Sequence, residues 1–470
     1  MKPTSLFIDR KKELDYLERV YNKEGKQLII LYGRRRIGKT ELITHFSSDK
    51  TSIYFLADKR GTVKNAERFA EICAVHFDDV RPDVKGFDDV FTYIKNRVKK
   101  EKIIVIIDEF SYLVEKDESI PSVFQLIFDE ILKETNILLI LAGSSVSMMY
   151  RGALSYESPL YGRRSGDWML KAMSFQQIKK FYPKLSIEEM IKTYAIVGGI
   201  PAYATHFQSN GINGIFESIK FNILTKGEYL YNEPEVLLKE ELRDPSSYFS
   251  ILEAMTSSAK LTDIANAARI PAKDMPKYLK ILEDLEIVYK ITPITEKKSK
   301  KSLYFIKDNF FSFWFKFIYP KKSELESGQI ESVLSLIKRD FNTYVGKVFE
   351  QVCKEYVEQK KIVPFSKIGK WWGYSRDKKM NERIMEEIDI VSIDENTGNI
   401  LFGECKWQEN VNAVDLTIEL AEKASFVDWK KDSRKPTLVI FAKSFSKRII
   451  QTENSVLVYC FDLKDLYEYL

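Results

Sequence analysis

The chain has 470 residues, of which 44% are hydrophobic and 30% are charged, and it carries a formal net charge of +5 at pH 7. This length and composition exclude a disordered chain and indicate a folded protein of about three domains. The charge is too small for the whole surface to attract nucleic acid, so any such contact must depend on local patches. Four scattered cysteines and three distant histidines argue against a disulfide framework or a zinc site, so any metal should have oxygen ligands.

No segment of the sequence is suited to a membrane. The first residues, MKPTSLFIDRKKEL, lack the apolar core of a signal peptide. No later run approaches the roughly 20 apolar residues that span a bilayer. We therefore expect a cytoplasmic protein without a membrane partner.

Short apolar runs in the first third of the chain predict a buried parallel sheet. Residues 27–32, 102–110 and 136–144 are rich in Ile, Leu and Val, and segments with helical spacing separate them. Such an alternation is typical of α/β proteins whose parallel strands are buried on both faces. The predicted domain covers residues 1–170.

A phosphate-binding loop follows the first of these runs. Residues 33–40 read GRRRIGKT and match the pattern G-x-x-x-x-G-K-[ST] between a strand and a helix. Its glycines let backbone N–H groups point at phosphate oxygens, Lys39 would reach the β- and γ-phosphates, and Thr40 would bind Mg²⁺. The residues expected at the nucleotide are Gly33, Arg34, Arg35, Arg36, Ile37, Gly38, Lys39, Thr40 and Glu41. By themselves they do not distinguish ATP from GTP.

Further polar residues follow the next two strands. Asp108 would hold Mg²⁺ and Glu109 would polarise the attacking water. Ser144 could sense the γ-phosphate, although a Gly-Ser-Ser sequence also simply forms a turn. One of Arg163 and Arg164 could be an arginine finger, in cis or from a neighbouring subunit of a homo-oligomer. The alternative is a solvated basic turn.

The middle of the chain is predicted to be mostly helical. Residues 171–235 have helical patterns interrupted by VGGIPAY, which indicates a helical lid. Between residues 236 and 320, three helical segments and two strand-like runs have the order of a winged helix-turn-helix. Its third helix carries Lys277 and Lys280, and its basic tip carries Lys297, Lys298, Lys300 and Lys301. These lysines could contact DNA, or the winged helix could pack on the nucleotide domain.

Two segments follow the winged-helix pattern. The aromatic residues 310–319 are dense enough that we expect a core between the ATPase and the C-terminal domain rather than a base-stacking surface. Residues 321–332 are the best candidate for a linker.

A second group of polar residues lies in residues 335–470, which are predicted to form another mixed α/β domain. In the run ILFGECKW, a strand would place Glu404 and Lys406 on one face and Cys405 on the other. A hairpin would bring Asp389 beside Glu404, and Glu350 lies on a helix that could dock on these strands. The Asp389 and Glu404 carboxylates could hold Mg²⁺, beside a lysine that activates water. A surface ion pair is the alternative.

The first 320 residues resemble a known family. The motifs FIDRKKEL, GRRRIGKT, DEF, GSS, YGRR and GGIPAY are similar to those of the archaeal-type ATPases, which are STAND-like relatives of the AAA+ ATPases. The resemblance implies ATP and Mg²⁺ as cofactors. It also implies an adenine site lined by Phe7, Asp9, Arg10 and Pro201.

The last 136 residues resemble the PD-(D/E)XK nuclease superfamily. The matching residues are Glu350 on a helix, then Asp389, then Glu404-Cys405-Lys406, with Ile388 in place of the motif's proline. The resemblance implies DNA cleavage, although members of this superfamily often keep the fold and lose the activity.

We therefore predict an α/β protein with a P-loop NTPase parallel sheet, a helical lid, a winged helix-turn-helix and a C-terminal restriction-endonuclease-like domain. The predicted boundaries are 1–170, 171–235, 236–320 and 335–470. The function expected is an ATPase coupled to DNA binding or cleavage. Two alternatives stay open: a signalling or assembly switch with an inert C-terminal domain, and a transcription regulator that uses the winged helix alone.

Overall fold

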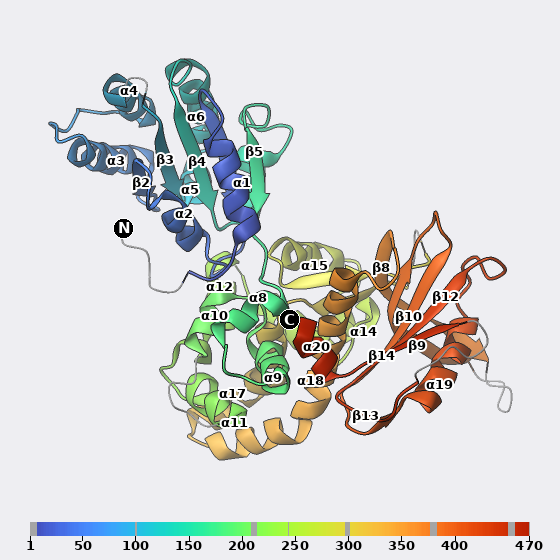
Figure 1. The fold of residues 1–470 in the computed structure, drawn as a ribbon. Helices are drawn as coiled ribbons and strands as arrows, with labels where there is room; N and C mark the ends of the chain where they lie inside the picture. Colours follow the sequence, from blue (N-terminus) through green and yellow to red (C-terminus); the bar gives the residue numbers. More distant parts are fainter. Residues whose placement is uncertain are drawn as a thin grey trace. The chain divides into compact units, whose positions relative to one another are not determined.

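The computed structural model describes residues 7–98, 101–207, 214–242, 244–296, 301–376, 383–449 and 456–469. The chain forms two compact units, Met1–Ala172 and Met173–Leu470, shown in Figure 1. The predicted helical lid, winged helix-turn-helix and C-terminal domain therefore all lie within the second compact unit.

The first unit contains the predicted parallel sheet. Its five strands have the order β2-β3-β4-β1-β5, and all neighbours are parallel. Every residue of β3 and β4 is buried, because helices cover the sheet on both faces. The strands are β1 (Gln27–Tyr32), β2 (Ser52–Leu56), β3 (Ile103–Asp108), β4 (Ile137–Gly143) and β5 (Gly166–Met169). The helices are α1 (Lys11–Tyr21), α2 (Lys39–Ser47), α3 (Thr62–His76), α4 (Phe87–Val98), α5 (Phe110–Lys116), α6 (Ile120–Leu126), η1 (Ile127–Ile131), α7 (Val146–Met149) and η2 (Tyr150–Leu154).

The second unit begins with a helical region, as the sequence predicts. Its elements are α8 (Phe175–Ile178), η3 (Lys179–Phe181), α9 (Ile187–Val197), α10 (Pro201–His206), α11 (Ile215–Ile219), η4 (Lys220–Leu224), η5 (Tyr229–Tyr231) and α12 (Glu233–Glu241). Both α8 and α9 begin with a capping box, formed by Ser174 with Gln177 and by Ser186 with Glu189. These local bonds satisfy backbone N–H groups that a helix start otherwise leaves unpaired.

Three helices and a two-stranded ribbon follow in the predicted order. They are α13 (Ser246–Met255), α14 (Leu261–Ala268), α15 (Met275–Asp284), β6 (Val288–Ile291) and β7 (Leu303–Ile306). The ribbon is antiparallel, and Lys260 adds a bridge to Leu303. Of the predicted basic tip, Lys297, Lys298 and Lys300 lie outside the described residues, and Lys301 forms an ion pair with Glu296.

The aromatic segment is buried, as predicted, and its hydrogen-bond and ring contacts with Tyr231, Tyr344 and Phe249 lie within the second unit; a position between the ATPase and the C-terminal domain stays a prediction. Phe310, Phe311, Phe313, Trp314 and Phe315 have no solvent exposure. This segment forms α16 (Asn309–Phe313), η6 (Trp314–Ile318) and η7 (Tyr319–Lys321). The predicted linker is wrong: α17 (Lys322–Glu326) and the start of α18 (Ile330–Lys360) occupy it. Its polar residues lie on the outer faces of helices, which composition alone cannot distinguish from a flexible connection.

A mixed sheet forms the rest of the second unit. Its strand order is β14-β12-β10-β9-β8, with β8, β9 and β10 antiparallel and with β12 and β14 parallel to β10. The strands are β8 (Lys367–Arg376), β9 (Arg383–Ile393), β10 (Asn399–Lys406), β12 (Lys435–Ala442) and β14 (Leu457–Phe461), with a small sheet of β11 (Val411–Asn412) and β13 (Phe445–Lys447). Helix α19 (Ala413–Ser425) contributes Leu420 and Ala424 to the core on one face, and α20 (Leu463–Tyr469) ends the chain.

Helix α18 joins this sheet to the helical region. Its Tyr344 hydroxyl donates hydrogen bonds to the carbonyls of Ala195 and Asn309, both at 2.9 Å. Its Glu355 carboxylate accepts one from the N–H of Phe175 at 2.9 Å. These bonds explain why residues 173–470 form one unit.

No helix in the described parts of the chain combines the length and apolar character needed to span a membrane.

We predict that Glu355 makes stability depend on pH. Burial raises the pKa of this carboxyl from its ordinary 4.5 to about 7, so the folded chain holds a proton that the unfolded chain releases. Unfolding free energy should therefore fall as pH rises from about 4.5 to about 7, by roughly 3 kcal/mol. Glu355→Gln keeps an acceptor for the Phe175 N–H, and its unfolding free energy should lack this dependence on pH. Chemical denaturation of both proteins across this range measures it, and parallel pH profiles would contradict the prediction.

Candidate functional site

The phosphate loop connects β1 to α2 at the carboxyl edge of the parallel sheet. Gly38 (φ 89°) and Arg36 (φ 69°) both have left-handed backbone conformations. A Cβ atom on Gly33 would lie 2.5 Å from the carbonyl oxygen of Leu170. Glycine is therefore required at position 33 by close backbone approach and favoured at position 38 by its φ angle.

Lys39 stabilises this loop from within. Its Nζ donates to the carbonyls of Gly33 at 2.9 Å and Arg34 at 3.1 Å, and the residue is 6% exposed. The loop thus holds a buried ammonium group close to its own backbone, where it can attract phosphate oxygens.

Asp108 faces the first turn of α2. Its Oδ2 accepts hydrogen bonds from the hydroxyls of Thr40 and Tyr54, each at 2.8 Å. Burial, followed by the charge of Asp108, raises the pKa of Tyr54 well above its ordinary value, so this hydroxyl stays a donor. A carboxylate beside a threonine hydroxyl is the type of oxygen pair that suits Mg²⁺. Tyr54 was not predicted.

Glu109 and Ser144 are in contact. The Glu109 Oε2 accepts hydrogen bonds from the Ser144 hydroxyl at 2.7 Å, the Ser144 N–H at 3.3 Å and the Ser111 hydroxyl at 3.2 Å. Glu109 also has a positive φ of 54°, a conformation that non-glycine residues rarely adopt. The structure therefore connects the ends of β3 and β4 through the predicted base and the predicted sensor.

Arg10 ties the segment before α1 to the phosphate loop. It is 4% exposed and donates to the carbonyls of Ile37 at 3.0 Å and Lys171 at 2.9 Å. Burial lowers the pKa of its guanidinium. The resemblance implied a place near adenine, whereas the observed contacts are with the Ile37 carbonyl of the loop, the Lys171 carbonyl after β5 and the Glu13 carboxylate.

The other residues implied at the adenine are only partly placed. The Phe7 ring stacks on His45 of α2, with centroids 4.0 Å apart, and an Asp9 carboxylate oxygen accepts from the Lys11 N–H at 3.5 Å. Pro201 is the first residue of α10, in the second unit, and its role near the base stays a prediction.

Arg163 and Arg164 lie at the opposite edge of the sheet from the phosphate loop. Ser165, which follows them, donates its N–H to Leu28 near the start of β1, on the order of 15 Å along the strand from Gly33. Arg163 forms an ion pair with Asp129 at 2.7 Å, and Arg164 forms one with Asp167 at 3.1 Å. The cis version of the arginine-finger prediction is therefore wrong, and the version in trans stays a prediction.

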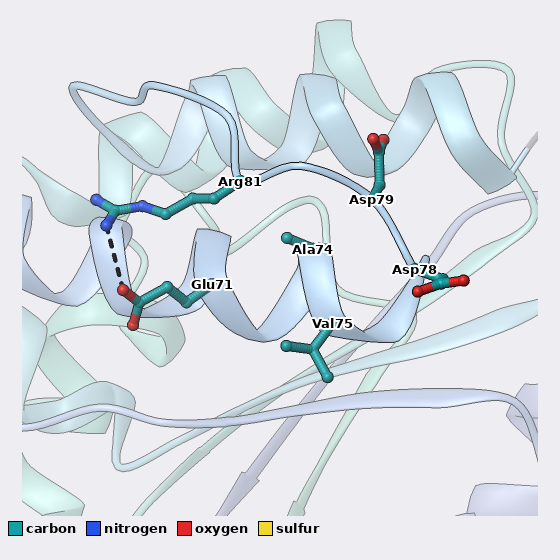
Figure 2. Close-up of a pocket in the computed structure, with 6 residues that line it drawn as sticks. All are labelled: Glu71, Ala74, Val75, Asp78, Asp79 and Arg81. Carbon is teal, nitrogen blue, oxygen red and sulfur yellow. Dashed lines mark hydrogen bonds and ion pairs between the residues drawn. The ribbon is translucent and has the colours of Figure 1, made fainter.

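A shallow pocket of ≈ 550 Å³ also lies in this unit, at the carboxyl end of α3 (Figure 2). The Glu71–Arg81 ion pair, 3.1 Å long, borders it. Because α3 begins near the carboxyl end of β2 and runs back along the sheet, the pocket lies away from the phosphate loop. It lacks every residue predicted at the nucleotide.

The second group of predicted residues meets at a β-bulge. Gly369 of β8 pairs with Val391 of β9, but Trp371 pairs with Ile388, so β9 has one extra residue opposite Lys370. That irregularity includes Asp389, whose Oδ2 accepts from the Cys405 N–H of β10 at 2.9 Å. A bulge of this kind redirects a side chain out of the regular alternation.

Glu404 is buried and paired with two lysines. Its Oε1 accepts from Lys406 at 2.8 Å, and Lys423 of α19 lies 3.1 Å from both carboxylate oxygens. The Glu404 side chain is 7% exposed, which excludes a surface ion pair. Cys405 is buried on the other side of the strand, beside Cys353 of α18.

Lys370 connects the remaining carboxylates. It forms ion pairs with Glu350 of α18 and with Glu387, the latter at 3.3 Å. Burial and the charges of Glu350 and Glu404 raise the pKa of Asp389 to about 7, and burial also raises that of Glu350. We refer to Glu350, Lys370, Glu387, Asp389, Glu404, Lys406 and Lys423 as the carboxylate–lysine cluster.

Sequence reasoning missed Lys370, Lys423 and Glu387. Lys370 lies in β8, which pairs with β9, so strand pairing was the available signal, whereas nothing in the sequence connects Lys423 to Glu404. Among the described residues, no group of three or more His, Cys, Asp and Glu side chains is arranged to hold a metal ion. The two carboxylates of the predicted metal site have other partners in this structure. Asp389 accepts from the Cys405 N–H, and Glu404 accepts from Lys406 and Lys423.

Comparisons with known proteins identify the family. A family model described as an ATPase domain predominantly from Archaea matches residues 7–207. A second model, described as archaeal and bacterial proteins of unknown function, matches residues 314–418. An uncharacterized protein of Methanocaldococcus jannaschii is 36% identical over 411 residues, which cover 86% of this chain and 88% of the relative. The chain belongs to this archaeal ATPase family. It is therefore an ATP-binding ATPase.

Other matches are shorter or more distant. An uncharacterized ATP-binding protein of the same organism is 56% identical over 45 residues, or 10% of this ATPase and 76% of the relative. The solved Walker-type ATPase of Pyrococcus abyssi has 20% identity and a TM-score of 0.46, covering 67% of this chain and 98% of its own. The ORC2 protein of Aeropyrum pernix has 14% identity and a TM-score of 0.42, covering 71% and 97%.

We predict that Lys39→Ala lowers ATP hydrolysis by at least about 100-fold, because it removes the cation inside the phosphate loop. Nucleotide affinity should fall as well, which fluorescent-nucleotide titration measures. Lys12→Ala, at an exposed position of α1, is the matched control. Normal turnover in Lys39→Ala would contradict the assignment of the loop.

Glu109→Gln should separate binding from hydrolysis. The amide keeps an acceptor for Ser144 but loses the negative charge that polarises water, so turnover should fall by roughly 100-fold. Nucleotide affinity should stay close to that of the wild type. A loss of affinity equal to the loss of turnover would instead indicate a structural role.

Proposed function

We propose that this chain is a Mg²⁺-dependent ATPase that controls a DNA-cleaving cluster in its second unit. The ATPase part rests on the convergence of Lys39, Thr40, Asp108 and Glu109 at one edge of the parallel sheet. Lys39 would hold the β- and γ-phosphates, and Thr40 and Asp108 would hold Mg²⁺, which offsets phosphate charge when bound.

Glu109 would orient and polarise the attacking water in this reaction. Its hydrogen bonds to Ser144 and Ser111 fix the orientation of the carboxylate. When a γ-phosphate reaches Ser144, the Ser144 hydroxyl can donate to the phosphate in place of Glu109. Tyr54 holds Asp108 in place through its hydroxyl. Arg163 or Arg164 would act only on a neighbouring subunit of a homo-oligomer.

One observation supports the nuclease-like part. Asp389 lies in the β9 bulge beside the Cys405 N–H of β10, Glu404 of the same strand is paired with Lys406, and the charges of Glu350 and Glu404 both act on Asp389; these residues are distant in sequence and resemble the PD-(D/E)XK pattern. Asp389 and Glu404 would position a divalent cation, and Lys406 would orient the attacking water. DNA is the proposed substrate.

The winged-helix elements are proposed to transmit motion more than to read bases. The N–H of Ile294, beyond β6, donates to the Lys370 carbonyl of β8 at 3.0 Å, and Ile294 contributes to the core of the mixed sheet. The ribbon is thus attached beside the carboxylate–lysine cluster. Lys277 on α15 is exposed and could still contact DNA phosphates.

A switch without nuclease activity is the second candidate. It is favoured by the pairing of Glu404 and Glu350 with lysines, because a charge-balanced network can be a structural element. ATP binding would then control assembly with partners, and the cluster would only stabilise the fold.

We expect Mg²⁺-dependent cleavage of DNA that Asp389→Asn and Glu404→Gln abolish and Lys39→Ala alters. Single-stranded, duplex and branched DNA are compared with and without ATP. Glu395→Gln, at an exposed position in the turn before β10, is the matched control. Intact ATP turnover without cleavage of any of these DNAs would reject the nuclease and leave the switch.

A further inference from the structure

Glu404 has a fixed place in the mixed sheet. It belongs to β10, which lies between β9 and β12. Phe402, two residues earlier, is part of the same core as Leu420 and Ala424 of α19. Because side chains two residues apart in a strand share a face, Glu404 lies on the α19 side of the sheet. Its carboxylate is therefore buried at a position that the sheet determines.

Two lysines share this carboxylate unequally. The Lys406 ammonium donates to Oε1 of Glu404 at 2.8 Å. The Lys423 ammonium donates to both Oε1 and Oε2, each at 3.1 Å. Of the two lysines, Lys423 is therefore the one that is bonded to the second oxygen.

Lys423 can leave Glu404 without a movement of its helix. It lies in the last turn of α19, beside the buried Ala424, so its backbone is held by the core. Its side chain is 24% exposed, and the unbranched stem lets the ammonium turn to water. Glu419 is exposed and lies four residues earlier on the same helix, a spacing at which Glu and Lys attract each other. The lysine can thus move while the buried carboxylate stays.

We propose that Lys423 sets the affinity of the carboxylate–lysine cluster for a divalent cation, because its ammonium and the cation compete for the Glu404 carboxylate. This rests on the cation site proposed above for Asp389 and Glu404, and it names the residue that regulates that site. Mg²⁺ and Mn²⁺ bind carboxylate oxygens, and both oxygens of Glu404 already accept from ammonium groups. A cation at Glu404 therefore requires that Lys423 releases Oε2.

A purely structural ion pair predicts the opposite change. Removing one member of a buried pair leaves an unbalanced charge and destabilises the fold, and a displaced carboxylate would hold a cation less well. If Lys423 competes with the cation, the same removal destabilises the protein only until a divalent cation replaces the lost charge. The direction of the change in cation affinity therefore separates the two roles.

The test measures Mn²⁺ binding by the full-length protein without nucleotide or DNA, from the electron paramagnetic resonance signal of free Mn²⁺. Glu404→Gln identifies the site, since the binding that this variant lacks is the binding that depends on Glu404. Lys423→Met keeps the stem and removes the charge, so the dissociation constant of this site should fall roughly 10-fold. Mn²⁺ should also raise the melting temperature of Lys423→Met more than that of the wild type. Lys423→Gln should change affinity less, in the same direction, because its amide is still a donor.

Lys406→Met is the matched control. It removes the same charge from the same carboxylate, but Lys423 still donates to both oxygens, so Mn²⁺ affinity should change little. Lys431→Met, at an exposed position after α19, should change nothing.

Each result decides the proposal. Equal or weaker Mn²⁺ binding in both Lys423 variants overturns it and assigns a structural role to the ion pair. An equal gain in Lys406→Met also overturns it, because net charge alone would then explain the change. A lack of Glu404-dependent binding in the wild type and in both Lys423 variants overturns it together with the proposed cation site. Cleavage is scored separately: cation binding that Lys423 controls, without cleavage of any DNA, rejects the nuclease and supports this inference.

Discussion

Helix α18 is the element on which the arrangement of residues 173–470 depends. Its 31 residues extend over about 46 Å, and buried side chains recur along most of this length. Tyr344 satisfies two buried carbonyls of the helical region, Glu355 holds the start of α8, and Glu350 reaches Lys370 in the mixed sheet. One rigid helix thus fixes the positions of the helical region, the aromatic core and the carboxylate–lysine cluster.

The two candidate sites are organised by different physical means. At the phosphate loop, the main partners of Asp108 and Glu109 are neutral hydroxyl and N–H donors, which can be exchanged for phosphate or metal at little electrostatic cost. In the carboxylate–lysine cluster, partly buried carboxylates are balanced by lysines. Removing one member there leaves an unbalanced charge in a poorly solvated place, which is costly. The neutral donors at the phosphate loop suit a site whose contacts change with each turnover. The ion pairs of the carboxylate–lysine cluster favour one fixed arrangement of side chains.

Particular residues show how far sequence reasoning extended. The phosphate loop, the apolar strands and the aromatic core depend on neighbours in the chain or on simple burial, and the structure has them where the patterns indicate. The linker at 321–332 was mistaken because helix surfaces and loops share polar residues. Lys370, Lys423 and Tyr54 were missed because each meets its partner only through strand pairing or helix docking. The sequence does not determine where Arg163 and Arg164 lie. The pairing of β1 with β5 places them at the edge of the sheet opposite the phosphate loop.

The sequence by itself determined the α/β class and located a phosphate-binding loop, since a glycine-rich loop between an apolar strand and a helix can be recognised from local order alone. It also named Glu350, Asp389, Glu404 and Lys406 as a possible group. Only the tertiary structure decided that Asp389 contacts the Cys405 N–H of β10, that Glu350 and Glu404 are paired with lysines, and that β9 has an extra residue at the bulge that includes Asp389. Strand register and helix docking result from burial summed over the whole unit, and no short stretch of sequence contains that sum.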